Sequence, residues 1–207
     1  MAFVKKNSSE AVAENQAEPV RDSRTLLAEL ESDDASVRRW AARDLADLPG
    51  HAVELMERLK VEQSQSVREV ILTSLTRLGD PDAVAGMVEC LRSEDAALRN
   101  EVVEAMKQMP DEVAPIMLGL LADADPDVRI FTVNVLESLC HPEVEGWLID
   151  VITNDAHVNV CATAVDLLGE VGSQAALEPL AQLKARFSDE PYIQFAADLA
   201  LRRINEN

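Results

Sequence analysis

A short pattern recurs along this chain at intervals of 30 or 31 residues. The dipeptide Val-Arg begins at Val37, Val67 and Val128, and Leu98-Arg99 fills the gap between the second and third copies. Val160 and Ile193 begin two degenerate copies. A unit of this length has room for two helices, and it must bury its apolar side against neighbouring copies. The repeat therefore constrains the fold more than any other feature.

Other positions keep the same register. The residues four, eight and eleven places after each start are apolar in every copy, with Thr132 as the one exception. Together with the starts they lie on one side of a helix of 3.6 residues per turn, so each start marks a helix with a buried stripe. The eighth places are Leu45, Leu75, Met106, Leu136, Leu168 and Leu201, and the last of the eleventh places are Val171 and Ile204.

A first helix precedes each of these second helices. We expect first helices at residues 52–59, 83–91, 113–121, 144–152 and 175–183. Polar turns separate the two helices of a pair, and their Asp, Ser and Asn side chains are expected to cap the second helix. Glycines after the second helices predict left-handed caps, and prolines predict helix starts. These are Gly79, Gly172, Pro81, Pro126 and Pro142.

The predicted fold is all-α: a solenoid of about six antiparallel helix pairs, wound as a right-handed superhelix, over residues 23–207. Its second helices begin near Val37, Val67, Leu98, Val128, Val160 and Ile193. Residues 1–22 lack the period and are mixed polar, so we expect a flexible tail there.

The charge balance limits the partners. Lys and Arg total 19 against 38 Asp and Glu, a net charge of −19. This disfavours nucleic acid and anionic membranes, and it favours a protein with a basic patch, unless the charge is only a solvated coat. No apolar stretch reaches membrane-spanning length, and nothing at the start resembles a signal peptide. Three widely spaced cysteines fit a reducing cytoplasm.

The motif Asp-x-x-Val-Arg, with Ala four places on, Leu eight places on and then Leu78-Gly-Asp-Pro, resembles the HEAT repeat. More narrowly it is similar to the short HEAT-like repeats of the phycocyanobilin lyase family. The resemblance covers about residues 23–207. It implies the fold more than the function, because such repeats serve scaffolds, adaptors, lyase subunits and a few enzymes.

The resemblance also implies a ladder of Arg and Asp between successive repeats. Its members here are Arg38, Arg68, Arg99 and Arg129, with Asp34, Asp95 and Asp125 as partners, while the second repeat offers only Gln63 and Gln65. These arginines could instead bind an anionic ligand, but buried Arg normally has a carboxylate partner. Cys161 and Gln194 replace the later arginines, and no Lys or Arg occurs from residue 130 to residue 183.

The outward side of the second helices is the predicted protein-binding surface, on the concave face of the solenoid. Trp40 belongs to a residue type that dominates interfaces, although it could pack sideways between repeats. Phe195 and Leu199 predict a docking or self-association patch unless the tail covers them, and the oligomeric state stays open. The surface comprises Arg39, Trp40, Arg43, Glu69, Thr73, Asn100, Glu101, Glu104, Ile130, Phe131, Asn134, Phe195 and Leu199.

Metal and catalytic sites are not indicated. His157 and Cys161 share a helix, but Cys140 and His141 should lie a helix length away, which argues against zinc. No phosphate-binding loop, dinucleotide turn or nucleophile motif occurs. We therefore predict a non-catalytic adaptor or scaffold without a cofactor. The alternative is a bilin lyase-like enzyme subunit or a chaperone for a chromophore- or cofactor-bearing protein; the role of Cys161 stays open.

Overall fold

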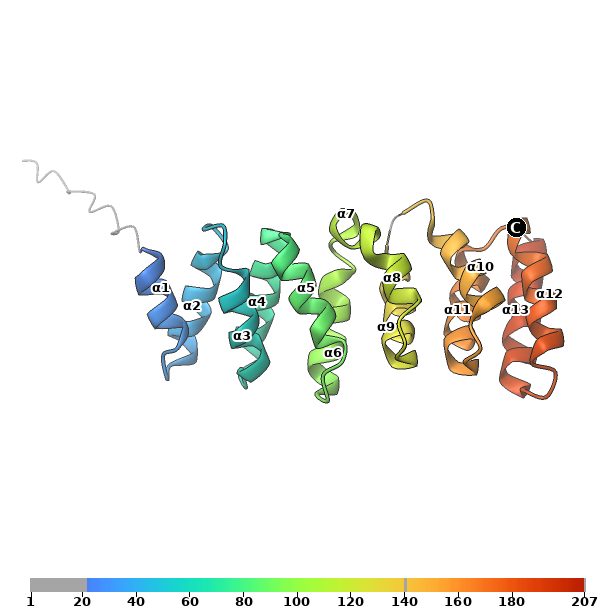
Figure 1. Ribbon diagram of the computed structural model, residues 1–207, viewed down its shortest axis with the longest axis horizontal. Coiled ribbons are helices and arrows are strands. Elements are labelled where there is room, and N and C mark those ends of the chain that lie inside the picture. The colour runs from blue at the N-terminus through green and yellow to red at the C-terminus, as the bar shows by residue number, and fades with distance from the viewer. Residues whose placement is uncertain (1–21, 140, 207) are drawn as a thin grey trace, which may run out of the picture.

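A computed structural model of the protein describes residues 22–139 and 141–206, and all regular structure in them is helical (Figure 1). Within these ranges six helix pairs follow one another along a rod, which confirms the predicted α-solenoid. The pairs are α1 (Ser23–Leu30) with α2 (Ala35–Leu45), α3 (Ala52–Val61) with α4 (Gln65–Leu78), α5 (Pro81–Cys90) with α6 (Ala96–Met106), the segments α7 (Pro110–Val113), η1 (Ala114–Ile116) and α8 (Met117–Leu121) with α9 (Pro126–Leu136), α10 (Val144–Asn154) with α11 (Val158–Val171), and η2 (Gln174–Ala176) and α12 (Leu177–Arg186) with α13 (Pro191–Glu206).

The second helices form a continuous row. Each contacts the next, in the order α2, α4, α6, α9, α11 and α13, and each also packs against its own first helix. The residues eight places after the repeat starts share one interior, in which only Leu201 is partly exposed. Thr132, the polar exception, is buried and donates its hydroxyl to the Val128 carbonyl at 2.8 Å. Val171 differs from the expectation: it is 45% exposed, because it is the last residue of α11.

Caps at the helix ends follow the turn chemistry in most repeats. Asp34, Asp95 and Asp125 each accept a hydrogen bond from a backbone N–H in the first turn of the second helix. Gly79 has the predicted left-handed conformation, with φ of 58°. Gly172 does not, since its φ is −72°. A Cβ there would lie 2.4 Å from the Leu168 carbonyl oxygen, so this glycine is needed for space and not for a positive φ.

The first helix of the fourth repeat is broken, although the sequence pattern predicts one helix over residues 113–121. Pro115 lies in its middle, where a proline lacks the N–H of a helical bond and its ring clashes with the preceding turn. What remains is α7, a short 3₁₀ segment and α8. The next first helix, α10, begins at Val144 and not at Pro142.

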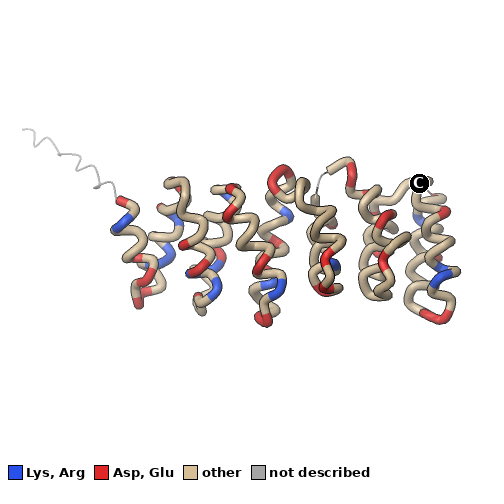
Figure 2. The backbone as a smooth tube through the Cα atoms, viewed as in Figure 1, with Lys and Arg blue, Asp and Glu red and all other residues tan. Residues whose placement is uncertain are grey.

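The predicted tail lies almost wholly outside the described residues. Of residues 1–22 only Asp22 is described, and its carboxylate caps α1 by accepting the Thr25 N–H at 2.8 Å. Across the described part of the chain, no helix combines the length and the apolar character that a membrane crossing requires. Charge is unevenly spread along the rod: Figure 2 shows Lys and Arg in the earlier repeats and again near the C-terminus, with none between residues 130 and 183.

Candidate functional site

The predicted binding surface lies on the outward side of the second helices, and we call it the second-helix face. None of its predicted residues is buried, because they fall at the positions opposite the apolar stripe. Arg39, Trp40, Arg43, Glu69, Thr73, Asn100, Glu104 and Phe195 are exposed, while Glu101, Ile130, Phe131, Asn134 and Leu199 are half-buried. Helices α2, α4, α6, α9 and α13 contribute them, so the predicted residues extend from the first to the last second helix, with none on α11.

The N-terminal end of this face presents an aromatic ring between two cations. Trp40 is 45% exposed and does not pack between repeats. The Arg43 guanidinium carbon lies 4.1 Å from its ring centroid, and that of Arg39 lies 5.6 Å away. Arg43 also bonds the Asp44 carboxylate at 2.6 Å. These cation–π contacts restrain the ring, and the 45% of Trp40 that remains exposed is available to a partner.

The middle of the face is acidic, but its carboxylates differ in availability. Glu69 accepts a bond from Gln65 on the same helix, and Glu104 pairs with Lys107 at 2.9 Å, both on the exposed side. Glu101 is engaged differently, since it accepts the Arg68 Nε–H at 2.8 Å from the preceding repeat. Glu101 therefore ties repeats together, which leaves Glu69 and Glu104 as the freer acidic contacts.

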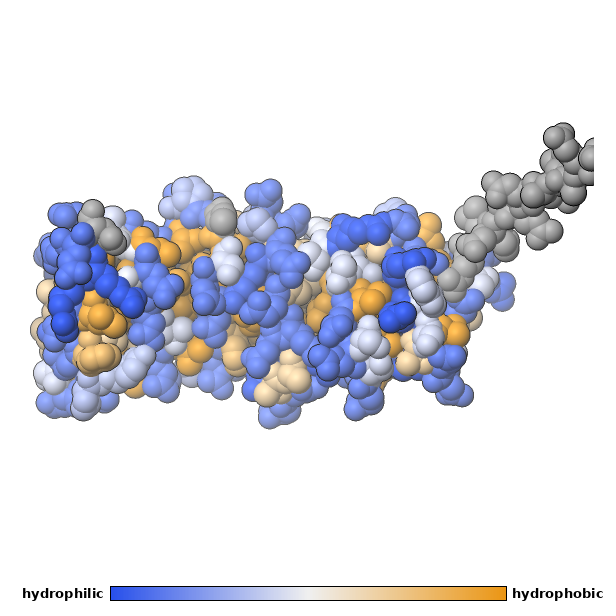
Figure 3. Space-filling model, turned by 180° about the vertical axis from the view of Figure 1, so that it is seen from behind, coloured by the Kyte–Doolittle hydropathy of each residue, from blue (hydrophilic) through white to orange (hydrophobic). Residues whose placement is uncertain are grey.

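The C-terminal end of the face is apolar. Phe195 is 64% exposed, and Leu199 lies one helical turn further on α13. Sequence reasoning missed Tyr192, which is 54% exposed and donates its hydroxyl to the Asp166 carboxylate of α11 at 2.5 Å. The signal was available, because Tyr192 precedes Phe195 by one helical turn. We call Tyr192, Phe195 and Leu199 the apolar end patch; Figure 3 shows apolar atoms at this end of the rod, on the left.

Arg38, Arg68 and Arg129 bond carboxylates in the next repeat, and each such link is called a rung of the ladder. The first rung, at Arg38, is the most buried. Arg38 donates Nε–H and Nη2–H to the two carboxylate oxygens of Glu62, both at 2.7 Å, and Arg58 donates to the same carboxylate at 2.9 Å. Burial alone would raise the pKa of Glu62, but the bonds from Arg38, the Ser64 amide and Arg58 outweigh it and lower the pKa to about 2. Glu62 thus stays charged inside the stack.

The other rungs vary in chemistry. Arg68 bonds Asp95 at 3.1 Å in addition to Glu101. Arg129 bonds both oxygens of Asp155, at 2.6 and 3.1 Å. Arg99 donates to the Ser93 carbonyl, its guanidinium carbon lies 5.3 Å from the Phe131 ring centroid, and its Nε has no hydrogen-bond partner among the described residues.

The partners differ from those expected. Asp34 and Asp125 cap their own helices, and of the three predicted partners only Asp95 bonds a ladder arginine as well. The carboxylates that bond Arg38 and Arg129 stand at the end of the first helix, five residues before the repeat start, at Glu62 and Asp155. The aspartate three residues before the start is used instead as the N-cap of its own second helix.

Beyond Arg129, an arginine at a different position connects the last two repeats. Arg186, at the end of α12, donates to the carbonyls of Ile152 at 2.7 Å and Asp155 at 2.9 Å and reaches the Cys161 sulfur at 3.4 Å. It therefore binds the C-terminus of α10 from the following repeat. Cys161 occupies the place of the missing arginine as a small buried residue, and burial raises the pKa of its thiol.

No group of three or more His, Cys, Asp or Glu within residues 22–139 and 141–206 is arranged to hold a metal ion. Cys140, which the sequence places beside His141, lies outside the described residues. The His141 ring stacks on Trp147 with centroids 4.9 Å apart.

Comparison with known proteins agrees with the geometry. The family profile of HEAT repeats matches residues 52–129 and again residues 113–202. The chain belongs to the HEAT-repeat family. Among curated proteins no match is found for this HEAT-repeat chain.

Several solved structures are similar to this HEAT-repeat chain. An engineered protein from a structural genomics consortium shares 19% identity, with 90% of this chain and 97% of that chain covered and a TM-score of 0.41. A designed armadillo repeat protein shares 16% identity, with 89% of this chain and 100% of that chain covered and a TM-score of 0.42. A chain of the complex of CpcE and CpcF of phycocyanin lyase from Nostoc sp. PCC7120 shares 17% identity, with 94% of this chain and 98% of that chain covered and a TM-score of 0.37. These likenesses say nothing about activity or partner.

Proposed function

We propose that this HEAT-repeat protein is a non-catalytic adaptor that holds another protein against its second-helix face. The observation that carries the proposal is the composition of that face: an exposed aromatic at one end, exposed carboxylates in the middle and the apolar end patch at the other. Aromatic and apolar anchors provide most of the binding energy of protein interfaces, and charged groups around them select the partner.

The chemistry of the face favours a partner with a basic patch. Glu69 and Glu104 are exposed in its middle, and the chain as a whole carries a net charge of −19. A positively charged partner is attracted by this field before contact and is then oriented by it. The apolar end patch would bury its aromatic area in the same complex.

Reversing two charges tests the proposal. In a Glu69→Lys, Glu104→Lys double variant, capture of partner proteins from the cells that produce this chain is expected to fall about tenfold, because both exposed contacts become repulsive. Mass spectrometry of the captured proteins provides the measurement.

The matched control makes the same change of charge on the first helices, by Glu57→Lys and Glu178→Lys, both exposed. Capture that falls equally in both double variants, or in neither, contradicts a role for the second-helix face. The bilin lyase-like alternative has no observation of its own in its favour, because the likeness to the lyase complex is one of fold.

A further inference from the structure

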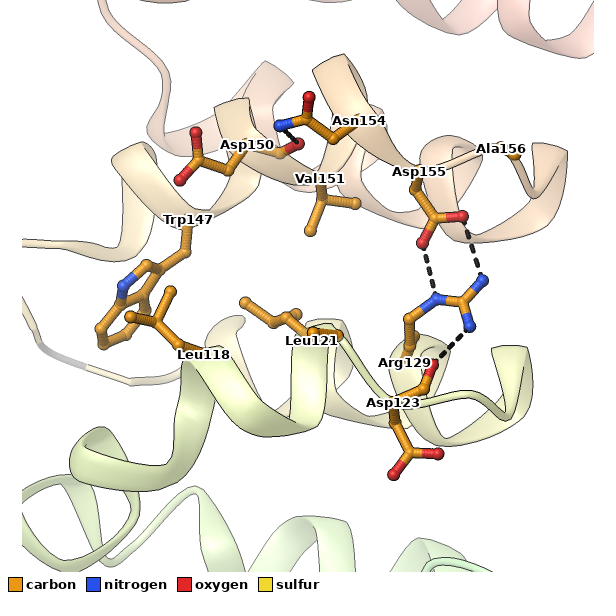
Figure 4. Close-up of a pocket in the computed structure, with 11 residues that line it drawn as sticks. Leu118, Leu121, Asp123, Arg129, Trp147, Asp150, Val151, Asn154, Asp155 and Ala156 are labelled. Carbon is orange, nitrogen blue, oxygen red and sulfur yellow. Dashed lines mark hydrogen bonds and ion pairs between the residues drawn. The ribbon is translucent and has the colours of Figure 1, made fainter.

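A cleft with a volume of about 410 Å³ lies between the fourth and fifth repeats, on the first-helix side of the rod (Figure 4). Leu118 and Leu121 of α8 form one wall, and Trp147 and Val151 of α10 form the other. Leu118 is 60% exposed, although it faces a second apolar wall. The cleft thus has an apolar wall on each of two helices, with polar residues beside them, and it is separate from the second-helix face.

The cleft lies beside the shortened first helix of the fourth repeat. Among the other first helices, α3 contacts α5 and α10 contacts α12. Here Pro115 interrupts the helix and leaves the five-residue α8, whose Leu118 is 60% exposed. The opposite wall is preformed, since the His141 and Trp147 rings are stacked with an interplanar angle of 8°. A preformed wall lowers the entropic cost of binding.

The polar groups around the cleft are mainly acidic. Asp123, Asp150 and Asp155 line it, against the single cation Arg129. Arg129 is already bonded to Asp155 at one end of the cleft, and Asp123 is bonded to Arg92. Asp150 is exposed at the side of Trp147 (Figure 4). Because Arg92 and Arg129 are bonded to Asp123 and Asp155, Asp150 is the exposed carboxylate of the lining that attracts a cation.

We propose that this cleft binds a peptide segment in which one Phe or Leu side chain is flanked by Lys or Arg. The apolar side chain enters between the walls formed by α8 and α10, and a flanking cation meets the exposed Asp150. The volume lies within the range of roughly 300–1,000 Å³ that binding pockets occupy. An apolar anchor in a pocket with complementary charge beside it is a common way to recognise a peptide.

The native tryptophans make the proposal testable by fluorescence. A Trp40→Phe variant leaves Trp147, in the wall of the cleft, as its single tryptophan. Its emission therefore reports on the cleft and not on the second-helix face, from which the other tryptophan has been removed. The probe is the capped peptide Lys-Lys-Phe-Lys-Lys. We expect a saturable change in Trp147 emission with half-saturation below about 1 mM. Capped Lys-Lys-Ala-Lys-Lys and Glu-Glu-Phe-Glu-Glu are expected to bind at least about tenfold more weakly, because one lacks the anchor and the other reverses the charge.

Two further changes in the Trp40→Phe background locate the site. Leu118→Ser removes the exposed wall and Asp150→Lys reverses the exposed charge, and each is expected to weaken binding of the Phe peptide about fivefold to tenfold. Val53→Ser and Glu178→Lys are matched changes at exposed first-helix positions away from the cleft, and they should leave binding unchanged.

Absence of a saturable change, or equal binding of the Ala peptide, would overturn the proposal. So would undiminished binding by both cleft variants. If the peptides fail while an uncharged apolar dye binds and is lost in Leu118→Ser, the cleft takes small apolar molecules and the peptide proposal is wrong. These outcomes leave the proposal for the second-helix face intact, because that proposal is tested by changing Glu69 and Glu104.

Discussion

Replacing Glu62 with glutamine is expected to lower the free energy of unfolding by about 3 kcal/mol at neutral pH. The carboxylate is 2% exposed and bonds both Arg38 and Arg58. Glutamine keeps the volume but removes the charge, which leaves two guanidinium groups without compensation in a partly buried place. For a chain of this length the loss corresponds to a melting temperature lower by roughly 6–12 °C. Urea unfolding followed by circular dichroism measures it.

The same variant should show a changed response to acid. Because the folded-state pKa of Glu62 is lowered to about 2, its contribution is complete above its ordinary value of 4.5 and is lost as the pH falls toward 2. The difference in stability between the native chain and Glu62→Gln is therefore expected to be largest at pH 5 to 7 and to shrink below pH 4.5. A difference that stays constant over this range would contradict the assignment.

Glu57 supplies the matched control for Glu62. It lies on the same helix and pairs with Lys60, but its side chain is 68% exposed. Glu57→Gln is expected to change the free energy of unfolding by less than about 0.5 kcal/mol. Equal losses in Glu57→Gln and Glu62→Gln would mean that the rung between the first two repeats is no stronger than a surface ion pair.

Replacing Arg129 with methionine is expected to loosen the last two repeats selectively. Its bonds to Asp155 join the fourth and fifth repeats at the place where α8 and α10 leave a cleft. Methionine keeps the apolar stem, but it leaves Asp155 without its cation, at a cost of about 2 kcal/mol for a partly buried pair. In a solenoid each repeat is stabilised only by its neighbours. The stability should therefore fall most in the repeats that follow the weakened interface.

Hydrogen exchange followed by mass spectrometry separates this local effect from a global one. In Arg129→Met we expect protection to fall more in α10, α11 and α13 than in α2 and α4. Arg92→Met is the control, because Arg92 makes a more exposed ion pair to Asp123, also between adjacent repeats. A uniform loss of protection along the chain, or a loss of the same size in Arg92→Met, would show that Arg129 has no special role at this junction.

The fold could be predicted because one helix in each repeat carries a complete signal. Leu45, Leu75 and their equivalents face inward in every copy, and a stripe at helical spacing has few other ways to become buried. The apolar pattern of the first helices is weaker. Pro115 is present in the sequence, but the pattern around it still predicts one continuous helix, whereas the structure has a break there. The cleft beside α8 depends on that break, so it was not predicted.

The partners of the ladder arginines were predicted less well than the arginines themselves. The arginines were recognised by their place, but their partners depend on which side chain faces the preceding repeat. Glu62, Asp123 and Asp155 each stand five residues before a repeat start, and each bonds an arginine of the preceding repeat. The carboxylate at this position could therefore have been recognised in the sequence. The bonds from Arg186 to the end of α10 could not, because they depend on how α12 packs on α10.

Surface exposure of the predicted face depended on the same register. Once the stripe fixes which side of a second helix is inward, Trp40, Glu69 and Phe195 must lie outward, and they do. The engagement of Glu101 by Arg68 could not be read in this way, since it lies at the edge between the two sides.

Site-specific cross-linking tests the central claim most directly. A photoreactive benzoyl-phenylalanine placed at Trp40, Glu104 or Phe195 in the cells that produce the chain is expected to capture the same partner protein from all three positions. The same group at Val53 or Glu178, on the first-helix side, should not capture it. Cross-links to a protein only from the first-helix positions, or none from the second-helix positions, would contradict the claim that this chain works by holding a partner on its second-helix face.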